Sequence, residues 1–292
     1  MSATNPVRRT PNTDWRANWR AGAALIRSTW LSWMQARSFF FLVAFGWMVP
    51  PLIYLFVWST VAGEDGAGGM SRDEFIVYYL LLILVNQVTY AQTNWTVGDT
   101  IRTGGFSRLL LYPMSPIFNT VASELAGKVV MLSFIAPATL LLALWLRPQV
   151  TFTWQSVVLF VPALLLAWLL RFFWGYWLAL LAFWSTRADA LLAVQDALVF
   201  LLAGQVAPVV LLPGAIQALA LLLPFWYMLG FPVEVLIGQL TAGELLRGFS
   251  LQLGWLLVAV AVYQLVWRRG LRRYSAVGGL AMRYLRLVGS FI

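Results

Sequence analysis

The chain has 292 residues, of which 61% are hydrophobic and 11% charged, and its formal net charge is +9. This composition excludes an ordinary soluble domain and is typical of an integral membrane protein, whose backbone must satisfy its own hydrogen bonds in lipid. The sequence contains neither cysteine nor histidine. Disulfides, thiol chemistry, histidine-based catalysis and histidine metal sites are therefore excluded.

The first 38 residues are polar and rich in arginine and tryptophan, too long for a signal peptide and without a cleavage signal. From Trp15 onward, apolar side chains share one helical face beside a stripe of arginines. The apolar face comprises Trp15, Trp19, Ile26, Trp30 and Trp33, and the stripe comprises Arg16, Arg20 and Arg27. We expect an amphipathic helix in the headgroup region of a bilayer. The alternative is a cytosolic helix that packs on a partner.

Six apolar segments predict six membrane-spanning helices. They are Phe39 to Ala62, Phe75 to Val97, Ile117 to Leu146, Trp154 to Trp184, a segment that opens at about Ala188, and Phe249 to Trp267. Thr186 and Asp189 have the spacing of a capping box at the start of the fifth segment. Between residues 213 and 240 the chain is apolar but broken by prolines and glycines. Its cleanest apolar stretch, Ala215 to Leu223, is too short to cross about 30 Å of hydrocarbon. We therefore expect a re-entrant segment that dips into the membrane before the last span.

The second span carries Asn86, Tyr90 and Asn94 at four-residue steps, so one face of this helix is hydrophilic. Lipid does not accept such a face, which must lie against protein or water. Two interpretations remain open for these three residues: they line a transport pathway, or they form hydrogen bonds between helices.

Two pairs of charged residues lie on the predicted spanning helices. The third span is long enough that we expect its first turns to protrude into the cytoplasm, and Glu124 and Lys128 lie there, four residues apart. This spacing predicts a mutually neutralising pair with a structural role. Arg171 and Asp196 lie in the fourth and fifth spans, at depths that differ by roughly 4–5 Å in an antiparallel hairpin. An unpaired charge inside the membrane costs on the order of 3 kcal/mol, so we expect Arg171 and Asp196 to form an intramembrane ion pair.

The segment Gly98–Pro116 interrupts two apolar runs with a short polar sequence. Its glycine pair breaks the backbone and its prolines end it, so its middle can form an amphipathic helix of two turns at most. The apolar side of that helix includes Phe106, Leu109 and Leu110. A short helix outside the bilayer, tied at both ends to spanning helices, can transmit motion. An ordinary connecting loop is the alternative.

The distribution of arginines along the chain indicates its orientation in the membrane. They concentrate at the two termini, and Arg102, Arg108 and Arg187 fall on the same side of a six-span topology as these termini. The arginines on the opposite side are Arg72, Arg147 and Arg247. The positive-inside rule therefore places both termini and Gly98–Pro116 in the cytoplasm, with Gly63–Glu74 outside.

The order of these elements resembles that of the transmembrane subunits of ABC type-2 exporters, over nearly the whole chain. In that family, the cytoplasmic loop between spans two and three typically contains, in this order, a basic residue, a glycine, a leucine pair and a proline. Here Arg102, Gly104, Leu109, Leu110 and Pro113 stand in a similar order. GQVAPVVLLP, with Gly204, Pro208 and Pro213, is similar to the family's pattern at the outer end of span five. The tail GLRRYSAVGG resembles a bacterial subgroup often encoded as two permeases beside one ATPase.

The resemblance implies a single transmembrane permease domain in the bacterial inner membrane. Within residues 1–292 it comprises an interfacial region (1–38), a six-span bundle (39–268) and a cytoplasmic tail (269–292). The implied partners are a cytoplasmic ABC ATPase dimer, a second permease, identical or paralogous, and membrane lipid; no nucleic-acid partner is expected. The implied ATPase-coupling residues are Arg102, Gly104, Gly105, Phe106, Leu109, Leu110 and Pro113.

The chain lacks the GxxxxGK[ST] motif that cradles phosphates, so ATP and Mg are expected on the partner ATPase and no cofactor, metal or catalytic residue on this chain. The substrate class implied is a lipid-linked, glycan or amphiphilic molecule that is moved out of the cytoplasm. An ion-coupled secondary transporter that uses Arg171 and Asp196 is the alternative, although spans 1–3 and 4–6 show no convincing internal repeat. An intramembrane enzyme is disfavoured because no nucleophile with a base, and no convergent carboxylates, are evident.

Overall fold

The computed structural model describes residues 23–24, 26–28, 30–32, 34–35, 42–43, 45–111, 116–185 and 187–274. Within these ranges every regular element is a helix, accompanied by one isolated β-bridge between Ala67 and Met70. The predicted all-α class is therefore confirmed. Much of the predicted N-terminal amphipathic helix, including Trp15 and Trp19, lies outside the described residues, as do Pro113 and the tail beyond Tyr274.

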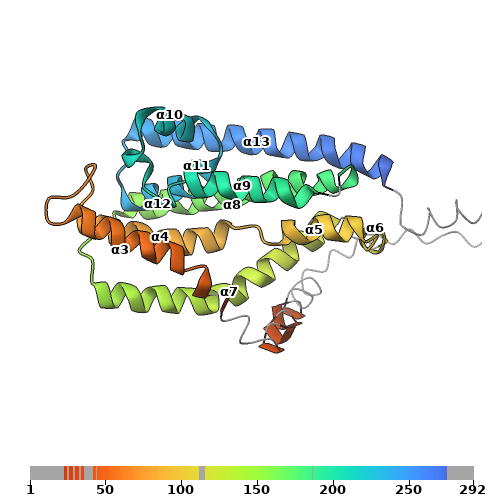
Figure 1. The fold of residues 1–292 in the computed structure, drawn as a ribbon, viewed down its shortest axis with the longest axis horizontal. Coiled ribbons are helices and arrows are strands. Elements are labelled where there is room, and N and C mark those ends of the chain that lie inside the picture. Colours follow the sequence, from red (N-terminus) through yellow and green to blue (C-terminus); the bar gives the residue numbers. More distant parts are fainter. Residues whose placement is uncertain are drawn as a thin grey trace, which may run out of the picture.

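The long helices run along one common direction and gather their connecting loops at the two ends of the bundle (Figure 1). The elements are α3 (Val49–Ala62), α4 (Arg72–Thr89), α5 (Thr93–Arg102), α6 (Phe106–Leu110), α7 (Pro116–Leu146), α8 (Trp154–Leu180), η1 (Leu181–Phe183), α9 (Ala188–Leu202), η2 (Val209–Leu211), α10 (Gly214–Leu222), α11 (Phe225–Met228), α12 (Gly230–Ile237) and α13 (Ala242–Arg273). One end carries α6, the turn before α9 and the end of α13, and we call it the α6 end (Figure 1). The loop before α4 lies at the opposite end.

Four helical segments of the described chain are long and apolar enough to cross a membrane. They are Arg72–Arg102, Pro116–Leu146, Trp154–Phe183 and Ala242–Arg273. The helix α3 is a shorter apolar helix of 14 residues. The predicted fifth span, α9, has 15 residues, whereas about 20 are needed for a complete crossing. It ends early because the chain turns at Gly204, whose φ of +88° is accessible to glycine.

The second span differs from the prediction because it is not continuous. α4 ends at Thr89 and α5 begins at Thr93, so the segment predicted as Phe75 to Val97 is two helices in sequence. Tyr90 has extended backbone angles, with φ −61° and ψ 127°, which interrupts the helical hydrogen-bond ladder. The short helix α5 therefore leads separately towards the α6 end.

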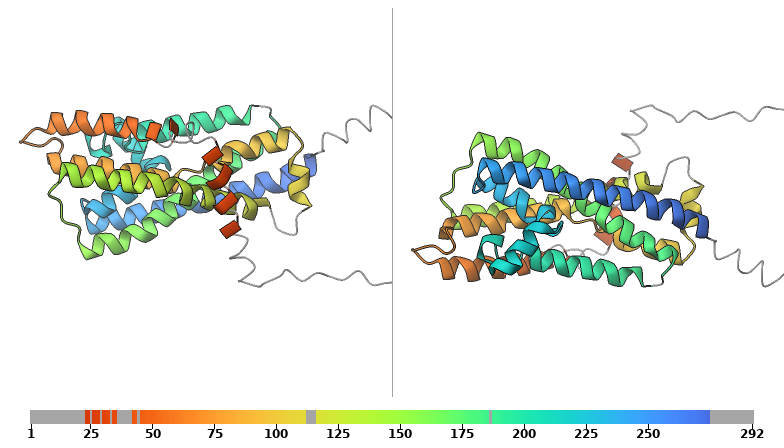
Figure 2. Two further views of the ribbon diagram at one scale, coloured as in Figure 1. Left: turned by 90° about the horizontal axis from the view of Figure 1, so that it is seen from below. Right: turned by 90° about the horizontal axis from the view of Figure 1, so that it is seen from above.

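The chain between α9 and α13 enters the bundle and returns to the end from which it came (Figures 1 and 2). Leu211 lies against Gly68 in the loop before α4, and Gly238 lies close to Ser156 at the start of α8. Between these points, Gly230 packs on the carbonyl oxygen of Ala203 deep in the bundle. Most side chains of α11 and α12 are fully buried. Such burial is what permits short, broken helices at membrane depth, because their free backbone groups are shielded from lipid.

Candidate functional site

The α6 end of the bundle contains the segment predicted to transmit motion. α5 ends at Arg102, and Gly104 then adopts a φ of +78°, a left-handed conformation that favours glycine. The five-residue helix α6 follows, so the predicted short helix of two turns at most is confirmed. The glycine pair thus separates α5 from α6.

Phe106 fixes α6 to its own chain. Its ring packs edge-to-face on Phe183, Trp267 and Tyr274, with centroid distances of 5.7, 5.9 and 5.7 Å. Only 1% of Phe106 is exposed. The prediction that Phe106 shares one exposed apolar surface with Leu109 and Leu110 is therefore wrong for Phe106. Leu109 is half-buried, whereas Leu110 and Leu111 are 40% and 85% exposed. The leucines at the end of α6 therefore form the free apolar surface.

Tyr274 joins the same segment to the end of α13. Its hydroxyl group accepts a hydrogen bond from the backbone N–H of Ser107 at 3.1 Å and donates one to the carbonyl oxygen of Gly104 at 3.2 Å. The hydroxyl groups of Ser107 and Tyr274 are 3.0 Å apart. These contacts of Tyr274 could not be predicted from sequence patterns, because the partners are distant along the chain.

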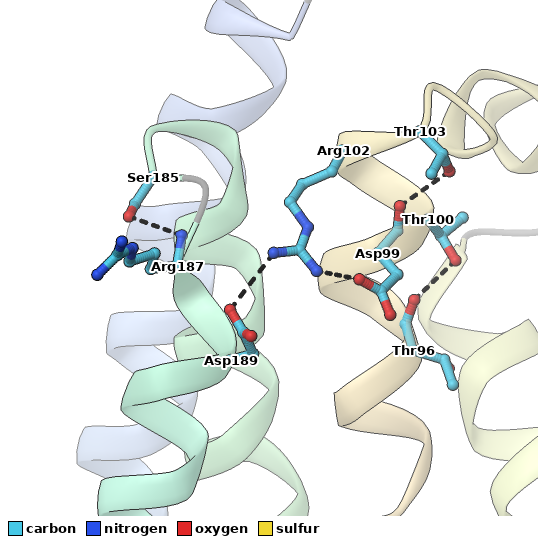
Figure 3. A network of polar contacts seen from close by, with 8 residues as sticks. All are labelled: Thr96, Asp99, Thr100, Arg102, Thr103, Ser185, Arg187 and Asp189. Carbon is cyan, nitrogen blue, oxygen red and sulfur yellow. Dashed lines mark hydrogen bonds and ion pairs between the residues drawn. The ribbon is translucent and has the colours of Figure 1, made fainter.

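Arg102 joins α5 to the start of α9 (Figure 3). Its guanidinium group forms an ion pair with Asp99 one turn earlier and a second with Asp189, at 3.4 Å. Asp189 therefore contacts α5. The predicted capping box involves Thr186, which lies outside the described residues, but α9 does begin at Ala188 as expected. The segment 98–111 is thus attached both to α9 and to α13.

The break between α4 and α5 is stabilised by the buried pair Glu124 and Lys128 of α7, whose charged atoms are 2.8 Å apart. Lys128 Nζ donates a hydrogen bond to the carbonyl oxygen of Tyr90, where α4 ends. Glu124 Oε2 accepts hydrogen bonds from the backbone N–H and the hydroxyl group of Thr93, at 2.9 and 2.7 Å. The positive charge of Lys128 lies at the C-terminal end of α4, which carries a partial negative charge. The negative charge of Glu124 lies at the N-terminal end of α5, which carries a partial positive charge. The predicted pairing is confirmed, and the same two side chains also form hydrogen bonds to the ends of α4 and α5.

Tyr90 also lies between Arg171 and Asp196. The guanidinium carbon of Arg171 is 4.9 Å from the centroid of the Tyr90 ring, and the Tyr90 hydroxyl group donates to Asp196 at 3.4 Å. Arg171 itself donates to Asn86 Oδ1 at 2.7 Å and to Thr89 Oγ1 at 3.2 Å. The ion pairs of the described residues do not include Arg171 with Asp196. The predicted direct pair is thus replaced by an arrangement in which a tyrosine bridges the two charges, because the hydrogen-bonding groups of α4 are nearer to Arg171.

The predicted hydrophilic face of the second span points into the bundle. Asn86 accepts from Arg171, and Asn94, 2% exposed, donates to the carbonyl oxygen of Phe172 at 3.1 Å. Gly175 makes this approach possible, because a Cβ there would lie 2.5 Å from the amide nitrogen of Asn94. These contacts are the interhelical hydrogen bonds of the second interpretation. Gln87, near the end of α4, and Gln92, in the break before α5, are further polar residues of this segment, and both line a cavity beside α7.

The four long apolar helices and the shorter one, together with charged groups that are buried and compensated, define a multi-pass helical membrane protein. Residues 48–278 match the family described as "ABC-2 family transporter protein". The chain belongs to this family and is a membrane component of an ABC-2 type transporter, a permease subunit without catalytic activity. Comparison with curated proteins and with solved structures gives no match.

Proposed function

We propose that this subunit exports an amphiphilic, lipid-linked or glycan substrate from the cytoplasm, driven by ATP hydrolysis on a separate chain that docks at residues 98–116. The observation that carries the proposal is the double attachment of this segment. Arg102 contacts Asp189 of α9, and Phe106 packs on Trp267 of α13. A displacement of the segment by a partner would therefore reach two further helices as well as α5.

The proposed docking surface is formed by Leu110 and Leu111, with the exposed Arg108 beside them. Exposed apolar side chains outside a bilayer are suited to a groove on a partner, and burial of each contributes up to about 1.5–3 kcal/mol. The implied partners are an ABC ATPase dimer and a second permease subunit. ATP and Mg would bind to the ATPase, since this sequence has no phosphate-cradling motif.

The proposed topology has both termini in the cytoplasm of a bacterial cell and six membrane crossings. The α6 end faces the ATPase. Residues 205–241 form a re-entrant segment at the outer side. The return of this segment to the end that carries Gly68 and Ser156 supports this assignment, because a seventh crossing would have to reach the α6 end.

The experiment that tests the docking surface replaces Leu110 and Leu111 by aspartate in the complex with its ATPase. We expect both the amount of co-purified ATPase and the stimulated ATP hydrolysis to fall at least tenfold, because two charges enter an apolar contact. Membrane insertion should persist, since the residues lie outside the spans. The control is Phe152→Asp, which alters an exposed apolar residue before α8, at the opposite end. A double variant that retains the ATPase and hydrolyses ATP at the wild-type rate would exclude this surface.

A further inference from the structure

The helix α13 has 32 residues and ends at the α6 end of the bundle (Figure 1). Its last turns carry four exposed arginines, which are Arg268, Arg269, Arg272 and Arg273. Their spacing of one, three and four residues makes them neighbours on the surface of the helix. We call these four residues the arginine face.

The arginine face points away from the bundle. Gly270 marks the buried side of α13 at this level, because a Cβ on Gly270 would lie 2.1 Å from Cδ2 of Phe183. Arg268 and Arg272 are each two residues from Gly270, which places them roughly 160° from it around the helix. The side of α13 that carries the arginines is therefore opposite the side that packs on the protein.

An exposed apolar stripe of α13 leads directly into the arginine face. Val258, Leu265 and Arg272 follow one another at steps of seven residues, close to two helical turns, so they share one side of the helix. Val258 and Leu265 are 45% and 50% exposed. A contiguous exposed apolar surface on a spanning helix is suited to contact with acyl chains. The surface thus changes from apolar to basic on the side of α13 that faces the membrane.

The length of α13 places the arginine face at the level of the lipid headgroups. The exposed Arg247 lies near the other end of the helix, 21 residues before Arg268. At 1.5 Å per residue this separation is roughly 32 Å, close to the thickness of about 30 Å of the hydrocarbon core. Arg272 and Arg273 lie roughly 6–8 Å further along the helix. The headgroup layer on each side of the core is roughly 5–7 Å deep, so the arginine face lies where the phosphate groups are.

The described chain supplies no counter-charge to the arginine face. None of the ion pairs among the described residues includes one of these four arginines. At the α6 end, the carboxylates of Asp99 and Asp189 both pair with Arg102. The sequence after Tyr274 contains no aspartate or glutamate. Four guanidinium groups, each able to form two parallel hydrogen bonds to a phosphate, therefore require an anion from outside this chain.

We propose that the arginine face binds the phosphate groups of anionic phospholipids in the leaflet at the α6 end. The apolar stripe that contains Val258 and Leu265 provides the adjacent contact for their acyl chains. The inference goes beyond the proposed function, because it concerns the surrounding membrane and neither the exported substrate nor the ATPase.

The test uses the full-length permease with its co-purified ATPase in an uncharged detergent. Phosphatidylglycerol and phosphatidylcholine with the same acyl chains are added in equal amounts, one of them isotopically labelled. Native mass spectrometry then counts the bound molecules of each lipid. We expect at least about fivefold more bound phosphatidylglycerol, because each arginine near an anionic lipid surface strengthens the attraction roughly fivefold. Equal occupancy by the two lipids would overturn the proposal.

The variant Arg268→Gln/Arg269→Gln/Arg272→Gln removes three charges and keeps good helix formers. It should lower the occupancy by phosphatidylglycerol at least about tenfold without lowering that by phosphatidylcholine. The matched control removes three exposed arginines at the opposite end, Arg72→Gln/Arg147→Gln/Arg247→Gln, and should keep the preference. An equal loss of phosphatidylglycerol from both variants would show attraction by the overall charge only and would refute the site.

A second measurement uses the wild-type chain alone, so it does not depend on the folding of a variant. Bound phosphatidylglycerol should raise the thermal unfolding temperature above its value in phosphatidylcholine, because the lipid binds the folded protein. This difference should shrink between about 0.1 M and about 1 M salt, where the Debye length falls from about 10 Å to about 3 Å. A difference that is insensitive to salt would show that the phosphate charge is not recognised and would refute the proposal.

Two other occupants of the arginine face are distinguished on the same samples. Glycerol 3-phosphate carries the phosphate group without acyl chains, so little displacement of phosphatidylglycerol supports a lipid ligand. Complete displacement at low millimolar concentration would refute the lipid assignment in favour of a soluble phosphate compound. The amounts of co-purified ATPase and of any second permease should be unchanged in Arg268→Gln/Arg269→Gln/Arg272→Gln. A fall in either chain would assign the arginine face to a protein contact and refute the lipid assignment.

Discussion

The hydroxyl group of Tyr274 lies 3.2 Å from the carbonyl oxygen of Gly104, to which it donates a hydrogen bond across 170 residues of sequence. The bond links the end of α13 to the glycine at which α5 gives way to α6. Since Gly104 is held in a left-handed conformation, the bond fixes a point at which the backbone direction changes. Removal of this hydrogen bond therefore offers a way to test the transmission of motion from the ATPase separately from the docking of the ATPase.

Replacement of Tyr274 by phenylalanine should leave the ATPase bound but reduce substrate transport per ATP hydrolysed. The ring contacts with Phe106 and Phe183 are kept, while the hydrogen bonds to Gly104 and Ser107 are lost. We expect a loss of about 1–2 kcal/mol in the free energy of unfolding. The measurement is transport and ATP hydrolysis in the same proteoliposomes.

The matched control for Tyr274→Phe is Tyr263→Phe on α13. The ring of Tyr263 packs on Phe173 and Trp267, but its hydroxyl group has no hydrogen bond among the described residues. Tyr263→Phe should leave the rates of substrate transport and of ATP hydrolysis unchanged. An equal effect of the two substitutions would mean that Tyr274 acts only through general packing.

The pair Glu124–Lys128 should show strong non-additivity. Lys128→Met leaves the 3%-exposed Glu124 without its counter-charge, and removal of one member of a buried pair costs about 3–5 kcal/mol. In Glu124→Gln/Lys128→Met the buried charge is absent, and the glutamine oxygen can still accept from Thr93. The double variant should therefore be more stable than Lys128→Met alone.

Thermal unfolding in detergent, followed by tryptophan fluorescence, measures this difference. The comparison pair is Arg102 and Asp189, whose side chains are substantially exposed, so that Arg102→Met should alter thermal stability little. If the losses of thermal stability caused by Glu124→Gln and by Lys128→Met simply add in the double variant, the two residues do not act as a unit at the helix break.

Much of the fold could be predicted from hydrophobic patterning, because apolar runs of sufficient length have few alternatives in a membrane. The helix α7 begins within one residue of the predicted Ile117 and ends at the predicted Leu146. The interruption at Tyr90 could not be predicted in this way. Tyr90 is compatible with a helix interior, and what stabilises the break is Lys128 and Glu124, 38 and 31 residues from their partners.

The orientation of individual side chains was harder to predict from the sequence than the positions of the helices that carry them. The polarity of Asn86 and Asn94 correctly indicated a face that avoids lipid, but their partners, Arg171 and the Phe172 carbonyl group, are on another helix. Phe106 was grouped with Leu109 by spacing, whereas contacts with α13 bury it. A five-residue helix has too few turns for periodicity alone to distinguish its inner face from its outer face.

The bridge through Tyr90 predicts that Arg171 and Asp196 interact in a manner that depends on the tyrosine. A double-mutant cycle of Arg171→Leu and Asp196→Leu should give a coupling energy of at least about 0.5 kcal/mol in unfolding. The coupling should shrink when the cycle is repeated with Tyr90→Phe, since Asp196 then loses its hydrogen-bond donor. Coupling that is insensitive to Tyr90 would indicate a purely long-range electrostatic interaction.

The same residues allow the ion-coupled alternative to be tested. If Asp196 carries a transported proton, Asp196→Asn should abolish transport, and collapse of the proton gradient should do the same in the wild-type protein. A structural role predicts that ATP-driven transport survives both treatments, at a level set by the amount of folded protein. Proteoliposomes with ATP and an uncoupler distinguish these outcomes.

The last prediction concerns the membrane topology, and the absence of natural cysteine makes it straightforward to test. Ala67→Cys and Gln239→Cys should both react with an impermeant thiol reagent in intact cells, because the re-entrant segment returns to the outer side. Leu111→Cys should react only after permeabilisation. Leu111 is chosen because it is 85% exposed, whereas any side chain at Gly104 would be strained at its positive φ. Labelling of Leu111→Cys but not Ala67→Cys in intact cells would invert the proposed topology. Opposite behaviour of Ala67→Cys and Gln239→Cys would instead show that residues 205–241 cross the membrane completely.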